Sequence, residues 1–294
     1  MTSTSAQHAA PWTIDADRWP DVAVAAGSPV RAAVARALFN TGVARLPLRV
    51  RLPDGRLFGA GGPAAPVMIL HRPRQFFRRF GASGLIGFGE SYMAGDWDCA
   101  DLTGLLTVFA AHVDDLVPPW LQRLRALAVC RQPPGDVQTI QGARRNISRH
   151  YDLSNDLFAL FLDETMTYSA AIFTEPDGAP VEVPDTDGAH LLADTYTWIH
   201  KYIFPGGLLP SLTAIDNSLT RATRLRITAR EDFGAHYGQT LRIWRERFAA
   251  RADEVARLGF DEVFNRMWKF YLCYSEAGFR AGYIGVSQLT LARI

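Results

Sequence analysis

The stretch from Thr174 to Asp194, TEPDGAPVEVPDTDGAHLLAD, constrains the fold most, because it places the composition of a loop in the middle of the chain. It holds three prolines, two glycines and five acids between Glu175 and Asp187, without apolar periodicity. Proline removes a backbone donor and glycine favours turns, so we predict a linker or loop here. No regular domain is expected to run through this stretch.

Composition narrows the class of protein. With 294 residues, 48% hydrophobic content and a net charge of +1, the chain can bury one or two ordinary cores. Near-zero charge and the lack of a recognised binding module argue against nucleic acid. Cys99, Cys130 and Cys273 are odd in number and far apart, which favours a reduced, cytoplasmic compartment and suggests no zinc site.

Membrane contact is expected to be peripheral. The N-terminus lacks a basic region followed by an apolar core, so it does not look like a secretory signal. The longest apolar stretch, Leu102 to Val113, is short and is interrupted by Thr, Gly and His.

Local patterns predict elements near the N-terminus. From Val30 to Asn40 the sequence predicts a helix with Val34 and Phe39 facing inward. Alternating apolar residues around Pro53 to Gly55 predict a hairpin, and Pro66 to Leu70 predicts a further strand.

Two arginine-rich segments each allow two interpretations. His71 to Phe80, HRPRQFFRRF, either faces a phospholipid surface or covers a core, and we favour the structural reading. Trp120 to His150 carries six arginines against one acid, which is typical of a solvated face and equally of a surface that docks on anionic headgroups.

Specific polar residues gather among aromatics between His150 and Phe173, HYDLSNDLFALFLDETMTYSAAIF. Asp152 or Ser154 is a candidate helix cap before a Phe-rich run. Tyr168 and Ser169 follow as the pattern breaks into a loop. Periodicity alone favours a capped amphipathic helix with a satisfied His and Tyr.

These residues resemble the signature of the cyclopropane-fatty-acyl-phospholipid synthase family, which includes the mycolic acid cyclopropane synthases and related fatty-acyl methyltransferases. The match consists of HYD and SND, followed by Met166, Tyr168 and Ser169. Ala170 stands where most members have a cysteine. Further blocks are GESYMAGDW ending at Trp97, YIFPGG from Tyr202, EDFGAHY ending at Tyr237, and GFDEVFNRMWKFYLCYSEAGF from Gly259.

The resemblance implies an α/β fold: a helical N-terminal lipid-contacting domain over residues 1–130, and a truncated class I (Rossmann-like) methyltransferase domain over 131–294. More than about a hundred residues, a domain-sized piece, look to be missing near 174–193. Strand-like patterns at Arg224 to Thr228 and Tyr283 to Leu291 would form the antiparallel edge of the family's sheet. Without its other strands, that edge invites pairing with another chain.

The implied reaction is methyl transfer from S-adenosylmethionine to a cis double bond of an unsaturated acyl chain in a phospholipid, giving cyclopropane or methyl-branched chains. By resemblance, Tyr168 and Ser169 contact the cofactor. Tyr237 and the Ala170 backbone correspond to part of a bicarbonate base site, and Ser275 occupies a second family cysteine position. The Gly turn and acidic residue that bind the cofactor by dinucleotide-type geometry are not visible, so its site is incomplete.

The alternative interpretation is that the same residues have only structural roles. Tyr168 and Tyr237 would then be core tyrosines with satisfied hydroxyls, and His236 a structural histidine near a helix start. Aromatic residues at helical spacing are expected in the core, namely Trp244, Phe248, Phe264, Trp268 and Tyr271.

Our leading hypothesis is therefore a shortened lipid methyltransferase, weak or inactive, cytoplasmic and peripheral to the inner face of the membrane. The alternative is a non-enzymatic lipid-binding or dimer-forming remnant, including a homodimer. A third is a chain that borrows its missing core from a partner.

Overall fold

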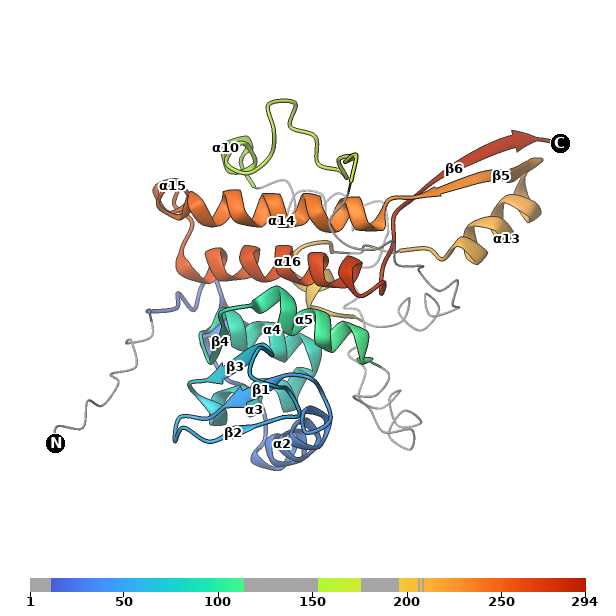
Figure 1. The fold of residues 1–294 in the computed structure, drawn as a ribbon. Coiled ribbons are helices and arrows are strands. Elements are labelled where there is room, and N and C mark those ends of the chain that lie inside the picture. The colour runs from blue at the N-terminus through green and yellow to red at the C-terminus, as the bar shows by residue number, and fades with distance from the viewer. Residues whose placement is uncertain (1–11, 114–152, 176–195, 206, 208) are drawn as a thin grey trace. The chain divides into compact units, whose positions relative to one another are not determined.

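The computed structural model describes residues 12–113, 153–175, 196–205, 207 and 209–294 (Figure 1). Contacts divide the chain into two compact units, residues 1–105 with 261–267 and residues 106–260 with 268–294. The boundary expected near residue 130, the arginine-rich stretch 120–150 and most of the linker 174–194 lie outside the described residues. Helices and small sheets occur together in the described parts, which confirms the α/β class.

The first unit combines short strands with helices. Its elements are α1 (Pro20–Ala23), α2 (Pro29–Val43), β1 (Arg49–Arg51), β2 (Leu57–Phe58), β3 (Val67–Leu70), α3 (Pro73–Ser83), α4 (Leu85–Met93), β4 (Trp97–Cys99) and the start of α5 (Leu102–Ala111). The strand order is β2-β1-β3-β4, with β1 and β3 parallel and the other pairs antiparallel. The predicted hairpin and third strand are thereby confirmed.

Helix α2 begins where its sequence signals say it should. Ser28 accepts a hydrogen bond from the Arg31 backbone N–H, and proline occupies the first turn. The buried face consists of Ala35, Phe39 and Val43, spaced four residues apart. The prediction that Val34 faces inward was wrong, since Val34 is 55% exposed.

Aromatic rings fill the core of this unit. The Phe39 ring contacts Phe76 edge-on at 5.3 Å between centroids, and Phe88 lies 4.8 Å from Trp97. Helices α3 and α4 approach closely at Gly87, where a Cβ atom would lie 1.9 Å from the Arg79 carbonyl oxygen. Only glycine fits at that crossing.

Buried charges tie the GESYMAGDW block into the unit. Asp96, fully buried, pairs with Arg79 at 2.7 Å and with Arg72 at 3.0 Å. Burial raises the pKa of Asp96, and the neighbouring guanidinium groups oppose that rise. Arg72 and Arg79 therefore support the structural reading of His71 to Phe80.

A third arginine reaches this block from far along the chain. Arg266 donates to the Tyr92 carbonyl at 2.6 Å and to Asp98 at 2.7 Å. Its guanidinium also lies 4.1 Å from the centre of the Tyr92 ring. The GESYMAGDW block thus serves the packing of its own unit, whatever its further role.

The second unit is mainly helical. Its described elements are α10 (Asn155–Ala159), α12 (Trp198–Tyr202), α13 (Leu212–Ala222), β5 (Leu225–Asp232), α14 (Gly234–Ala250), α15 (Ala252–Arg257), most of α16 (Glu262–Arg280) and β6 (Ser287–Arg293). The aromatic residues expected in the core are all buried. Glu276 on α16, with no exposed surface, pairs with Arg245 on α14 at 2.8 Å and with Arg280 at 2.7 Å.

Strands β5 and β6 form a two-stranded antiparallel ribbon, which confirms the predicted strands. Figure 1 shows this ribbon continuing from the ends of α14 and α16, with α13 beside β5. Within the described residues, β5 pairs with β6 alone, and a bulge falls between Ile227 and Ala229. The helices that the structure describes include none long and apolar enough to cross a membrane.

Candidate functional site

The segment that carries the proposed cofactor residues begins at a capped helix. Ser154 accepts a hydrogen bond from the Leu157 backbone N–H and so caps α10, one of the two caps considered. After α10 the Asp163 carboxylate accepts from the backbone and hydroxyl of Thr165. Met166 then adopts a left-handed φ of 55°, unusual for a residue with a side chain. This tight turn directs the chain into Tyr168.

Tyr168 lies in an aromatic cluster. Its ring stacks on Trp244 at 5.2 Å and 16°, and Phe158 contacts it edge-on at 5.5 Å. Its hydroxyl lies 2.6 Å from the hydroxyl of Tyr271. The loop side chain is therefore held by α14 through ring stacking and by α16 through a hydrogen bond.

Two further hydrogen bonds hold the following residues on α14. The backbone N–H of Ala171 donates to the Thr240 hydroxyl at 3.1 Å. The backbone N–H of Phe173 donates to His236 Nδ1 at 3.0 Å, and the Phe173 and His236 rings stack at 11°. Because Nδ1 accepts, His236 bears its neutral-state proton on Nε2. His236 has the structural role expected for it.

Burial controls the ionisation of the tyrosines. It raises the pKa of Tyr168 and of Tyr237, and it raises that of Tyr271 well above its usual value. The hydrogen bond from Tyr271 partly opposes the rise at Tyr168, while Tyr237 adds to it. All three hydroxyls thus keep their protons near neutral pH. They can hydrogen-bond to an anion or a polar ligand, but they are poor bases.

The other predicted site residues lie around this cluster. Ser169 is exposed and Ala170 half-buried. Tyr237 is half-buried on the first turns of α14, and its ring contacts Phe279 at 4.8 Å. Ser275 is buried on α16, one turn after Tyr271. The structure therefore brings the Tyr168 segment onto α14 and α16, the helices that carry Tyr237 and Ser275.

Sequence reasoning missed the polar partners of this segment. Tyr271 was expected in the core only, yet its hydroxyl holds Tyr168. Thr240 follows Tyr237 by three residues, so both lie on one face of α14. That spacing was the available signal for Thr240, while nothing local distinguished Tyr271 from its aromatic neighbours.

The described residues fit S-adenosylmethionine only in part. An aromatic cluster and an exposed serine are present on one side. A cofactor site of the dinucleotide type also needs a glycine turn after a parallel strand and a carboxylate at the end of the next. In the part of the chain that the structure describes, the parallel strands are β1 and β3, and both belong to the other unit. Among the same residues, neither the glycine turn nor the carboxylate occurs beside the Tyr168 cluster. These residues alone do not make a complete site.

Comparison with known families places the chain. The family model of mycolic acid cyclopropane synthetase matches residues 138–183 and 180–289. The two matched pieces meet near residue 180 and together span more than half of the chain.

Named relatives match over most of the chain. Tuberculostearic acid methyltransferase UfaA1 of Mycobacterium tuberculosis (strain H37Rv) is 37% identical over 411 residues, covering 95% of this chain and 96% of that protein. Cyclopropane-fatty-acyl-phospholipid synthase of Escherichia coli (strain K12) is 24% identical over 344 residues, covering 78% and 89%. An apo crystal structure of mycolic acid cyclopropane synthase CmaA1 overlaps 39% of this chain and 41% of its own, at 29% identity and a TM-score of 0.30.

The alignment to UfaA1 is longer than this chain. Since 95% of 294 residues is about 280, about 130 of the 411 aligned positions have no counterpart here. Both ends of the relative are nevertheless covered. With the two-part family match and 37% identity across nearly its whole length, this chain belongs to the mycolic acid cyclopropane synthetase family, an enzyme family whose named members include methyltransferases and cyclopropane synthases.

Proposed function

We propose that this chain is a shortened S-adenosylmethionine-dependent methyltransferase of unsaturated fatty-acyl phospholipids, and that alone it is weakly active or inactive. The observation that carries the proposal is the UfaA1 alignment, which matches both ends of the relative yet passes over about 130 positions. We place the missing positions near 174–193, where the two family matches meet. A loss of that size removes a domain-sized piece.

The proposed roles follow from the geometry of the Tyr168 cluster. Tyr168 and Ser169 would line the cofactor, which when bound supplies the methyl group. Tyr237 keeps its proton, so we assign it hydrogen bonding to bicarbonate rather than proton abstraction. Ala170 would offer its backbone to the same anion. The next residue along, Ala171, is fixed to α14 by Thr240, one turn after Tyr237.

Ser275 has a supporting role in this proposal. It is buried on α16, one turn from Tyr271, where many relatives have a cysteine. We assign it packing and hydrogen bonding behind the cluster, not nucleophilic chemistry.

A direct assay tests the proposal. Purified chain is incubated with methyl-labelled S-adenosylmethionine and vesicles of unsaturated phospholipid, with and without bicarbonate, and label in extracted lipid is counted. We expect label near background. Sustained turnover by the chain alone would refute the inactivity, and Tyr237→Phe compared with Tyr283→Phe, whose side chain is 38% exposed, would then test the assigned site.

A second candidate function is lipid binding without catalysis, at the cytoplasmic face of the membrane. The observation that favours it is a group of exposed arginines beside exposed apolar residues at the tip of the β5–β6 ribbon. Label in lipid measures methyl transfer, and vesicle binding measures the second function, so each function has its own readout.

A further inference from the structure

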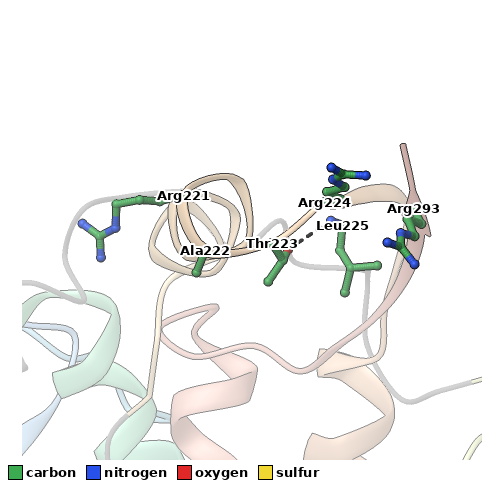
Figure 2. Close-up of a pocket in the computed structure, with 6 residues that line it drawn as sticks. All are labelled: Arg221, Ala222, Thr223, Arg224, Leu225 and Arg293. Atoms are coloured by element: carbon green, nitrogen blue, oxygen red, sulfur yellow. Dashed lines mark hydrogen bonds between the residues drawn. The ribbon is translucent and has the colours of Figure 1, made fainter.

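The tip of the second unit's ribbon concentrates positive charge. Where α13 ends and β5 begins, an open depression of about 590 Å³ is lined by Arg221, Ala222, Thr223, Arg224, Leu225 and Arg293 (Figure 2). Three of these six residues are arginines, and none is acidic. Arginine stays charged at any physiological pH and presents several donors, so this lining suits an anion.

The three arginines are exposed and have no carboxylate partner among the described residues. Neighbouring arginines of the same ribbon differ from them. Arg230 pairs with Asp232 at 2.7 Å, and Arg226 donates to the Leu225 carbonyl. Among the described arginines of the ribbon and the end of α13, the exposed ones without a carboxylate partner are therefore the three at the tip.

Backbone contacts fix the geometry of the tip. Leu225 pairs with Arg293 across the ribbon, and the backbone N–H of Ile294 donates to the Arg224 carbonyl. The Thr223 hydroxyl accepts from the Leu225 backbone N–H at 3.0 Å, which sets the turn from α13 into β5 (Figure 2). The arginines thus come from adjoining, hydrogen-bonded backbone.

Apolar side chains lie beside this charge. Leu291 is 42% exposed and Ile294 is 73% exposed. Helix α13 has no buried residue, although Leu212, Ile215 and Leu219 form an apolar stripe along it. Arginine interleaved with exposed apolar residues is the pattern of surfaces that settle into the headgroup region of a bilayer.

We propose that the ribbon tip, defined as Arg221, Arg224, Arg293 and the exposed Leu291, docks on the surface of an anionic phospholipid membrane. The arginines contact headgroup phosphates, and Leu291 enters the boundary with the acyl chains. The inference deepens the lipid-binding candidate of the proposed function by naming the surface responsible. It does not depend on cofactor binding or methyl transfer.

The test measures cosedimentation of the full chain with two kinds of vesicle, phosphatidylcholine alone and phosphatidylcholine mixed with phosphatidylglycerol, without S-adenosylmethionine. We expect binding to the mixed vesicles alone, weakening as salt is raised. Each arginine should contribute about fivefold in affinity, so the triple variant R221Q/R224Q/R293Q should bind about a hundredfold more weakly. Leu291→Ser should weaken binding without altering its salt dependence.

A charge-matched control separates the effect of the position of the arginines from the effect of net charge. The triple variant R242Q/R251Q/R257Q changes net charge equally, at the middle of α14, at the junction between α14 and α15, and at the end of α15, away from the ribbon tip (Figure 1). It should bind within about twofold of wild type, because an arginine that does not touch the surface adds little. Equal losses in both triple variants would show that net charge alone drives binding and would overturn the proposal. Thermal melting of each variant verifies that it folds.

Other occupants give distinct results. Stabilisation by inorganic phosphate without vesicle binding would indicate a site for a free anion and would overturn the membrane claim. Self-association that R221Q/R224Q/R293Q abolishes, again without vesicle binding, would assign the tip to a second copy and overturn it too. Absence of binding to the mixed vesicles would overturn this inference whatever the result of the methyl-transfer assay. Sustained methyl transfer would refute the proposed inactivity whatever the result of the vesicle assay, so the two failures are distinguishable.

Discussion

Replacing Tyr168 or Tyr271 with phenylalanine should cost stability unequally, and the double replacement should recover much of the loss. The two hydroxyls lie 2.6 Å apart, and the Tyr271 side chain is only 3% exposed. Tyr168→Phe leaves a buried hydroxyl without its partner, which costs about 1–3 kcal/mol of unfolding free energy. Tyr271→Phe leaves the Tyr168 hydroxyl without its partner, and because Tyr168 is half-buried rather than fully buried, a smaller cost of about 1 kcal/mol is expected.

The measurement is a double-mutant cycle on the free energy of unfolding, obtained by urea denaturation. Unfolding is followed locally, by hydrogen exchange in peptides covering 153–175 and 268–280. A local readout is needed because the chain has two compact units, and global unfolding need not be two-state. We expect a coupling energy of about 1–2 kcal/mol. Tyr283→Phe, with a more exposed side chain, should change stability by less than about 0.5 kcal/mol. Losses that add within about 0.5 kcal/mol would refute the claim that this hydrogen bond holds the loop.

Further predictions concern other contacts. Gly87→Ala should destabilise the first unit by about 1–3 kcal/mol or more, measured by the urea midpoint, because its Cβ would meet the Arg79 carbonyl at 1.9 Å. Asp96→Ala should cost about 3–5 kcal/mol in the same assay, since it leaves the guanidinium of Arg79 buried and unpaired; a loss below about 1 kcal/mol would contradict the pairing. Burial lowers the pKa of His200, so the unfolded chain binds a proton first as pH falls below about 6.5, and the unfolding free energy should decline from there toward the lower folded pKa. Hydrogen-exchange protection factors, which correct for the intrinsic pH dependence of exchange, should therefore fall in residues 196–205 over that range, and should not fall in His200→Gln. Thr240→Val should speed exchange at the Ala171 amide while Thr213→Val, on exposed α13, leaves it unchanged.

Local signals predicted local structure. The hairpin around Pro53 to Gly55 and the Ser154 cap follow from turn and cap chemistry, which acts over a few residues. The inward face of α2 was misjudged at Val34 because residues 34 and 35 are both apolar. Which of them is buried depends on where α3 packs, and neighbouring sequence does not carry that information.

Contacts between distant residues could not be predicted. Arg266 reaches Tyr92 and Asp98 from more than 160 positions away, and its own neighbourhood reads as an ordinary amphipathic helix. Tyr271 is likewise one aromatic residue among several on α16. The sequence indicated that the segment around Tyr168 was special through family motifs, but its attachment to Thr240 and His236 required coordinates.

The central claim is that this chain is a family member that lacks the core of its cofactor site. Titration calorimetry of the purified chain with S-adenosylmethionine tests that claim most directly. We predict no binding heat up to millimolar ligand. The residues around Tyr168 supply only one side of such a site, and the family's glycine turn and ribose carboxylate have no counterpart beside them in the described residues. Saturable binding in the micromolar range, lost in Tyr168→Ala, would contradict the account and show that this chain builds a working cofactor site.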